Sequence, residues 1–203
     1  MSPLLECLLA GPPTSGVRLS RHHVRFGRYV VSLTPHRFPR MPNGIVCEAE
    51  VDPEAELEIG GGALHVGATV ITADEDWDPV PIFHAPVDSP SIDRIDARLL
   101  AGRGPGLTPA GDDLLAGYAA GLTLFHTEGR RAATLANEAA ALTNSLSATL
   151  LLHASRGEVP EPVHDLLRTG DPRSLLQFGH TSGRWWLNGL VLAGYRPARV
   201  RTR

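Results

Sequence analysis

Residues 47–59, with the sequence CEAEVDPEAELEI, place an acidic side chain at every even position from 48 to 58. The odd positions carry small or apolar side chains, with Leu57 and Ile59 the largest. A period of two is typical of a β-strand that has one face in solvent and the other against a core. Because Asp52-Pro53 interrupts the pattern, the stretch predicts a pair of half-buried strands.

Strand and turn signals continue on both sides of this stretch. Residues 30–33 (VVSL) favour a strand, and Asn43-Gly44, shortly after two prolines, marks a turn. Three glycines at residues 60–62 predict another turn before the apolar run of residues 63–71. Residues 1–82 are therefore predicted to form a small antiparallel sheet or barrel.

Charge is unevenly divided within this β-rich region. Residues 18–40 carry six arginines and three histidines, whereas residues 48–78 carry ten carboxylates and no arginine. Cross-strand ion pairing on a small sheet explains the division, and a bipolar binding surface is the alternative.

The sequence pattern becomes helical after a linker. Residues 83–90 contain two prolines and no periodicity, which predicts a linker, and residues 91–203 form the predicted helical region. Ser91 is the expected N-cap of the first helix. The predicted helices cover residues 92–100, 112–126, 131–156, 161–168, 173–178 and 181–192. The expected fold class is therefore α+β, with an N-terminal small antiparallel β sheet or barrel followed by a C-terminal helical bundle.

The composition excludes several functions. All 19 basic side chains among the 203 residues are arginine, so a Schiff-base lysine, a lysine general base and a P-loop lysine are ruled out. A formal net charge of −3 disfavours a nucleic-acid partner, and no apolar run is long enough for a membrane span. Two cysteines give neither a disulfide framework nor a zinc spacing. Residues 3–10 lack the basic start of a signal peptide, so a cytoplasmic location is expected.

The segment of residues 102–113, GRGPGLTPAGDD, is the most unusual in the chain. Its density of glycine and proline predicts a backbone shaped for a close approach or for positive φ angles. Thr108-Pro109 predicts a helix start with Thr108 as the cap. Asp112 and Asp113 then stand at the mouth of an apolar helix that must be buried, where carboxylates need partners. One of them suits the helix dipole, but two together indicate catalysis or a bound metal, with Mg²⁺ as the candidate.

A second glycine-flanked segment, residues 179–183 with the sequence GHTSG, opens the last predicted helix. Free backbone N–H groups and the hydroxyls of Thr181 and Ser182 predict an anion site, and His180 is a candidate acid or base near neutral pH. An ordinary helix cap after a glycine turn is the alternative reading of this segment.

A polar stripe runs along the predicted helix of residues 131–156. Asn144 lies three residues before Ser147 and seven after Asn137, and Thr143 and Ser145 flank it, so these side chains are expected to share a face. Contact with a ligand through Asn144 and hydrogen bonding between buried helices explain the stripe equally well.

The string formed by residues 104–117, GPGLTPAGDDLLAG, resembles the signature of a bacterial family long classed as a domain of unknown function. Residues 179–183 resemble its second block, and residues 145–158 and 42–45 resemble weaker ones. That family includes the AllH-type subunit of oxamate carbamoyltransferase, which exchanges carbamoyl between oxamate and phosphate in anaerobic allantoin breakdown. The resemblance implies a similar subunit, acting with partner subunits or as a homo-oligomer on a small anionic metabolite of the carbamoyl phosphate or oxamate type.

The predicted site lies where the two glycine-flanked segments meet. The candidate catalytic residues are Asp112, Asp113 and His180, and Asp112 and Asp113 are also the candidate metal ligands. The candidate ligand-binding residues are Arg103, Gly104, Gly106, Thr108, Gly111, Asn144, Thr181, Ser182 and Gly183. Two alternatives stay open: a metal- or phosphate-dependent enzyme of another class, and a non-catalytic ligand-sensing or scaffold subunit.

Overall fold

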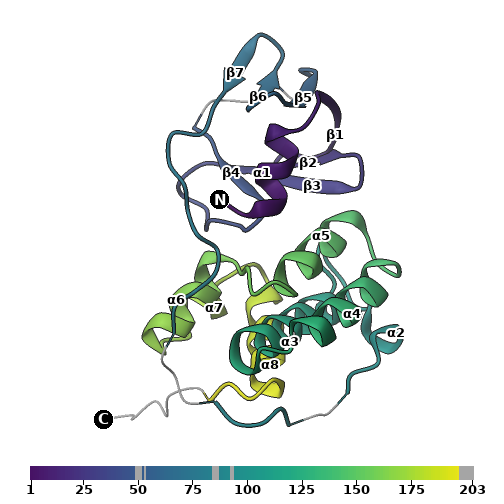
Figure 1. Ribbon diagram of the computed structural model, residues 1–203, viewed down its shortest axis with the longest axis vertical. Helices are drawn as coiled ribbons and strands as arrows, with labels where there is room; N and C mark the ends of the chain where they lie inside the picture. Colours follow the sequence, from purple (N-terminus) through teal and green to yellow (C-terminus); the bar gives the residue numbers. More distant parts are fainter. Residues whose placement is uncertain (49–51, 53, 84–86, 92–93, 197–203) are drawn as a thin grey trace. The chain divides into compact units, whose positions relative to one another are not determined.

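The computed structural model describes residues 1–48, 52, 54–83, 87–91 and 94–196. The chain divides into two compact units, Met1–Pro79 and Val80–Arg203. Figure 1 shows strands in the first unit and helices in the second, which confirms the α+β class.

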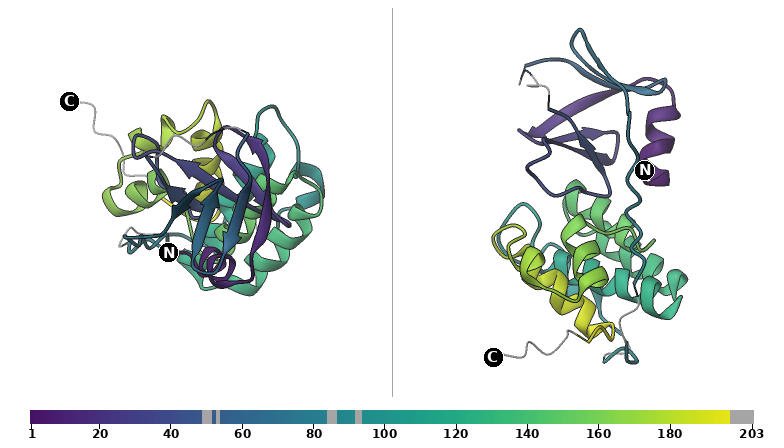
Figure 2. Two further views of the ribbon diagram at one scale, coloured as in Figure 1. Left: turned by 90° about the horizontal axis from the view of Figure 1, so that it is seen from above. Right: turned by 90° about the vertical axis from the view of Figure 1, so that its left-hand side faces the viewer.

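The first unit is one curled, half-barrel sheet of seven strands with a helix (Figures 1 and 2). The strand order is β4-β3-β2-β1-β5-β6-β7. Neighbouring strands are antiparallel except β3 and β4, which run in parallel. The elements are α1 (Pro3–Ala10), β1 (Thr14–Ser20), β2 (His23–Phe26), β3 (Tyr29–Thr34), β4 (Gly44–Val46), β5 (Leu57–Gly60), β6 (Ala63–Val66) and β7 (Thr69–Ile71).

The parallel pair corrects the expectation of a wholly antiparallel sheet. The chain leaves β3, loops back through residues 35–43 and enters β4 in the same direction. Asn43 is fully buried at the end of this loop, and its amide group donates to the carbonyl of Val30 at 2.8 Å and to the hydroxyl of Ser32 at 3.1 Å. These bonds hold the returning chain against β3.

The strand alternation of residues 47–59 is confirmed in its second half. Leu57 and Ile59 of β5 are buried and Glu58 between them is exposed. Cys47 and Glu48 lie outside any strand, and residues 49–51 and 53 of the first predicted strand lie outside the described residues. Residues 3–10, which the sequence argument assigned to no element, form α1 and bury Leu5 and Leu9 in the core of the sheet.

The second unit contains seven described helices. They are α2 (Ala97–Leu100), α3 (Ala110–His126), α4 (Gly129–Ala140), α5 (Ser145–Ala154), α6 (Glu161–Thr169), α7 (Arg173–Leu176) and α8 (Ser182–Leu192). None of the helices within the described ranges has both the length and the apolar character needed to cross a membrane.

The helix α3 lies at the centre of this unit, as its apolar sequence predicted. Almost all of its first twelve residues are buried, and its largest partner is α8. A Cβ atom on Gly117 would lie 2.2 Å from the carbonyl oxygen of Trp186, and one on Gly189 would lie 2.2 Å from that of Leu114. Glycine at these positions therefore lets the two backbones touch, and this contact fixes how α3 and α8 approach each other.

Two predicted helix starts are wrong. The first described helix of the second unit begins at Ala97, not after Ser91, because Asp96 caps it by accepting a bond from the Arg98 N–H at 2.9 Å. The hydroxyl of Ser91 instead donates to the carbonyl of Leu192. The helix α3 begins at Ala110 with Pro109 at the cap position and no side-chain cap, because Thr108 uses its hydroxyl elsewhere.

The single long helix predicted over residues 131–156 is also wrong. It is two helices, α4 and α5, separated by a turn that includes Thr143 and Asn144. Asn144 starts α5 by accepting bonds from the N–H groups of Leu146 and Ser147, both at 3.0 Å. Thr143, Asn144 and Ser145 of the polar stripe therefore mark a helix boundary, while Asn137 and Ser147 lie on different helices.

Candidate functional site

The two glycine-flanked segments meet at one hydrogen bond. The hydroxyls of Thr108, just before α3, and Ser182, the first residue of α8, lie 3.1 Å apart. Both side chains are half-buried. The close packing of α3 on α8 positions this junction, so two segments separated by more than seventy residues share one place in the fold.

Asp113 lies directly beneath this junction. Its carboxylate accepts a bond from the Thr108 hydroxyl at 3.3 Å, and the side chains of Ser182 and Trp186 also bond to it. The residue is 3% exposed. Burial raises the pKa of Asp113 to about 7, and the neighbouring charge of Asp112 adds to the rise while the three hydrogen bonds oppose it. Asp113 is thus a carboxyl group that changes charge near neutral pH.

Asp112 points to a different set of partners. Its Oδ1 atom accepts a bond from the N–H of Gly102 at 2.7 Å, and its Oδ2 atom accepts one from the hydroxyl of Thr143 at 2.5 Å. The residue is 2% exposed. Both oxygens are therefore engaged in tying the turn after α2 and the turn before α5 to the start of α3. This arrangement accounts for a buried charge in structural terms.

The glycine loop of residues 102–107 is exposed along its whole length. Gly102, Gly104 and Gly106 have φ angles of 69°, 108° and 107°, which side chains other than glycine rarely adopt. The alternation of glycine with other residues is therefore required by the path of the loop, which exposes its backbone to solvent beside Thr108.

Gly111 and Gly183 are required for packing. A Cβ atom on Gly111 would lie 2.0 Å from the carbonyl oxygen of Leu100, and one on Gly183 would lie 1.6 Å from that of Leu175. Both residues are buried. Close approach between backbones is enough to explain glycine at these two predicted ligand positions.

Most of the backbone donors at the two helix starts are already used. In α3, the N–H of Gly111 donates to the carbonyl of Arg103, and those of Asp112 and Asp113 donate to Pro109. In α8, the N–H groups of Gly183, Arg184 and Trp185 donate to carbonyls of Phe178 and Thr181. The expectation of backbone N–H groups that are free for an anion in residues 179–183 is therefore wrong at Gly183. The hydroxyl of Thr181 and exposed groups of the glycine loop are further donors on these two segments.

Four further candidates lie at the surface. Arg103, His180 and Thr181 are exposed, so solvent reaches them directly. Thr181 occupies the cap position of α8 but makes no side-chain cap bond. Asn144, also exposed, donates from Nδ2 to the carbonyl of Leu107 at 3.1 Å, which attaches the glycine loop to the start of α5.

No group of three or more His, Cys, Asp or Glu side chains is placed to hold a metal within the part of the chain that the structure describes. Mg²⁺ is commonly held through one or two carboxylates together with water and substrate phosphates. Asp112 and Asp113 offer two carboxylates, of which Asp112 has a protein donor on each oxygen. Magnesium binding stays a prediction.

Sequence reasoning missed several groups that complete this region. Thr143 and the N–H of Gly102 hold Asp112, and the buried Trp186 bonds to Asp113. None has a sequence signal, because each contact joins residues from different helices or turns.

Another buried polar pair of the helical unit, His153 with Glu158, links the end of α5 to the following turn. Burial lowers the pKa of His153, against the opposing effect of Glu158.

The comparison with protein families gives one match. Residues 100–194 match the model of a family described as oxamate carbamoyltransferase subunit AllH. The matched segment is a little under half of the chain and runs from the end of α2 to just beyond α8, so it includes both glycine-flanked segments. It supports the AllH-type resemblance for the helical unit and does not extend to residues 1–99. Searches of curated proteins and of solved structures gave no match.

Proposed function

We propose that this chain is a subunit of an oxamate carbamoyltransferase-type enzyme and that its helical unit binds a small anionic metabolite beside the Thr108–Ser182 junction. Carbamoyl phosphate and oxamate are the candidate ligands. The observation that carries the proposal is the hydrogen bond that brings the two segments together, because the AllH-type match includes both of them. A subunit of this kind acts with partner subunits, which we propose as its protein partners.

Anion binding at this place does not need lysine. Exposed Thr181, Arg103 and the backbone of the glycine loop lie on these two segments and can donate to an anion. The hydroxyls of Thr108 and Ser182 bond to the Asp113 carboxylate, and they become available as donors when that carboxyl takes up a proton. Carbamoyl transfer requires stabilisation of the negative charge that develops on the carbonyl oxygen, and fixed hydroxyl or amide donors provide it. Asp113 orients the two hydroxyls through its own bonds to them.

The test is ligand binding by the purified full-length chain. Oxamate, carbamoyl phosphate and inorganic phosphate are titrated by calorimetry, and thermal unfolding is followed with each, with chloride at matched ionic strength as the reference. Ligand that binds the native state raises the melting temperature by mass action. We expect at least one of the three anions to bind and Ser182→Ala to weaken it roughly tenfold, as for the loss of one hydrogen bond to a charged group.

Ser174→Ala is the matched control. Ser174 is an exposed serine of the same unit, on α7, and should leave the affinity unchanged. The proposal is wrong if none of the three anions binds, or if the Ser174 and Ser182 variants weaken binding equally.

A further inference from the structure

The first unit contains a cavity that none of the candidate site residues lines. Its volume is ≈ 410 Å³, within the range of small-molecule sites. Its wall comes from α1, from the segment between His36 and Glu48, and from the segment between Ile71 and Pro79. All three belong to the unit Met1–Pro79, so the cavity is complete within that unit.

The floor of the cavity is apolar. Leu5 and Leu9 of α1 contribute to it, and both are part of the core beneath the sheet. Ile45 and Ile71 also line it and pack against the same core while staying partly accessible. This floor can take the hydrocarbon part of a ligand out of water, which is the favourable part of binding a small organic molecule.

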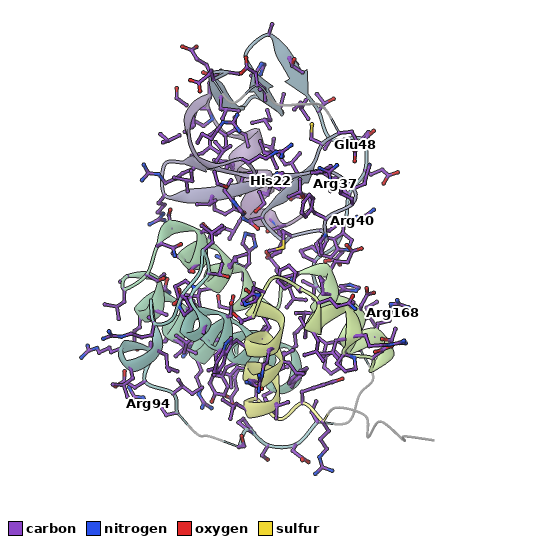
Figure 3. The ribbon with its side chains drawn as sticks, turned by 180° about the vertical axis from the view of Figure 1, so that it is seen from behind. His22, Arg37, Arg40, Glu48, Arg94 and Arg168 are labelled. Atoms are coloured by element: carbon purple, nitrogen blue, oxygen red, sulfur yellow. The ribbon has the colours of Figure 1, made fainter. Side chains whose placement is uncertain are left out.

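The mouth of the cavity is acidic. Glu48, Asp74, Glu75 and Asp76 line it and are exposed, whereas Arg40 is the one arginine among its lining residues. Figure 3 shows Arg40 and Glu48 on the same side of the first unit.

Asp74 and Glu75 are the carboxylates most open to a ligand. Neither forms an ion pair with any residue that the structure describes. Glu48 accepts a bond from the N–H of His36 at 2.6 Å, and Asp76 lies 3.9 Å from the amino group of Met1. The excess of carboxylates gives the mouth a negative potential.

An aromatic side chain completes the lining. Trp77 follows Asp76 along the cavity wall and is half-buried. The faces of aromatic rings attract cations, and indole attracts them more strongly than the other side-chain rings do. An apolar floor, an aromatic wall and an acidic mouth are together complementary to one class of ligand.

We propose that this cavity binds a small organic cation, with a hydrocarbon body on the apolar floor and an ammonium or guanidinium group at the carboxylates of the mouth. The site is separate from the anion site proposed for the helical unit, and its ligand has the opposite charge. An anionic metabolite is disfavoured in the cavity because it would face several carboxylates at short range. This inference does not rest on the proposed function.

The experiment compares three probes of nearly the same shape on the full-length chain. Phenethylammonium carries the positive charge, 2-phenylethanol is neutral, and 3-phenylpropanoate is negative. Binding is measured by calorimetry at low and at physiological salt, and the shift of the Trp77 indole signal in a nitrogen–proton NMR spectrum locates it. We expect the ammonium to bind most tightly, with an affinity that falls as salt is added. The proposal is overturned if none of the probes binds, if all three bind equally, or if 3-phenylpropanoate binds best.

Variants that remove carboxylate charges from the mouth without changing the size of the side chains test whether the negative charge contributes to binding. Asp74→Asn combined with Glu75→Gln removes two exposed charges and should weaken phenethylammonium roughly fivefold, since exposed charge pairs contribute modestly. Glu58→Gln is the matched control, because Glu58 is an exposed carboxylate of the same unit that does not line the cavity. Unfolding curves check that both variants are folded. An unchanged affinity in the double variant, or an equal loss in the control, overturns the proposal.

Discussion

The turn that holds Asp112 and the junction that holds Asp113 receive neighbouring carboxylates of almost equal burial, 2% and 3% exposed. The turn supplies a backbone N–H and a threonine hydroxyl, one for each oxygen of Asp112. The junction supplies hydroxyl and indole donors that do not offset the burial of Asp113, whose pKa rises to about 7. The start of α3 thus carries two carboxylates with different roles. Asp112 holds two turns together, and Asp113 changes charge near neutral pH, because successive side chains contact different neighbours.

The largest effect that separates the two regions is the pH dependence set by Asp113. The pKa of this group is about 7 in the native state and 3.8 in its ordinary environment. Between these values the native state holds a proton that the unfolded chain has released, so the stabilisation is complete below about pH 4 and is lost as the pH rises to about 7. Asp113→Asn stays neutral throughout, and its stability relative to the native chain should rise by up to roughly 4 kcal/mol across this range.

Urea unfolding of both proteins at about pH 5 and at about pH 8 measures the part of this difference that develops above pH 5, roughly 3 kcal/mol. Taking the difference between variant and native chain cancels the titration of the histidines, including His153 and His23, whose pKa values burial lowers. Glu138→Gln, at an exposed carboxylate of α4, is the control, and its difference from the native chain should show no comparable rise with pH. A flat difference for Asp113→Asn would contradict the assignment of Asp113 as the titrating group.

The second prediction concerns the turn. Asp112→Ala leaves the N–H of Gly102 and the hydroxyl of Thr143 without the buried carboxylate that accepts their hydrogen bonds. The loss of two hydrogen bonds to a charged group should lower the free energy of unfolding by about 3 kcal/mol. Urea unfolding at neutral pH measures it, and Asp113→Ala at the same pH should cost less, because the ionised Asp113 is itself unfavourable. If Asp112→Ala and Asp113→Ala lower the free energy of unfolding equally, the turn and the junction do not differ in how they stabilise their carboxylates.

The third prediction uses the two threonines that donate to the carboxylates. Thr143→Val removes one of the two donors of Asp112 and should cost about 2 kcal/mol. Thr108→Val should cost about 1 kcal/mol or less, because Ser182 and Trp186 still bond to Asp113 and its carboxyl can take up a proton. Thermal unfolding at neutral pH compares the pair, which differ from the native chain by the same chemical change. A larger loss of stability for Thr108→Val than for Thr143→Val would show that the junction depends more on its threonine hydroxyl than the turn does.

The sequence predicts what depends on local pattern. The strand around Leu57 and Ile59, the turn after it and the buried course of α3 follow from periodicity and glycine placement, and the structure has all three. The starts of α2 and α5, after the caps Asp96 and Asn144, were not predicted, because the apolar periodicity continues across both residues. Each start depends on a side-chain cap bond that the periodicity does not show. The parallel pairing of β4 depends on buried Asn43, whose partners lie more than ten residues away.

The candidate site also has features that the sequence predicts and features that it does not. That residues 102–113 and 179–183 meet was expected, and the bond between Thr108 and Ser182 brings them together. The different roles of Asp112 and Asp113 could not be predicted, because they depend on Thr143 and Trp186 from other helices and turns. Gly111 and Gly183 were predicted as ligand positions, and packing alone already requires glycine there, because carbonyl oxygens lie 2.0 and 1.6 Å from where their Cβ atoms would be. Their contact with a ligand stays a prediction.

A small effect is also predicted at Asn144, which connects the glycine loop to the turn region. Its Oδ1 atom caps α5 and its Nδ2 atom bonds to the carbonyl of Leu107. Asn144→Ala should cost about 1 kcal/mol, the usual value of a cap, since the exposed bond to Leu107 adds little. Asn137→Ala is the matched control, because Asn137 is exposed on α4 and caps nothing. If Asn144 also contacts the anion, its variant weakens oxamate or phosphate binding by more than the control does. A cap acting alone lowers stability and leaves the affinity of the folded chain unchanged, so the two measurements together separate the roles.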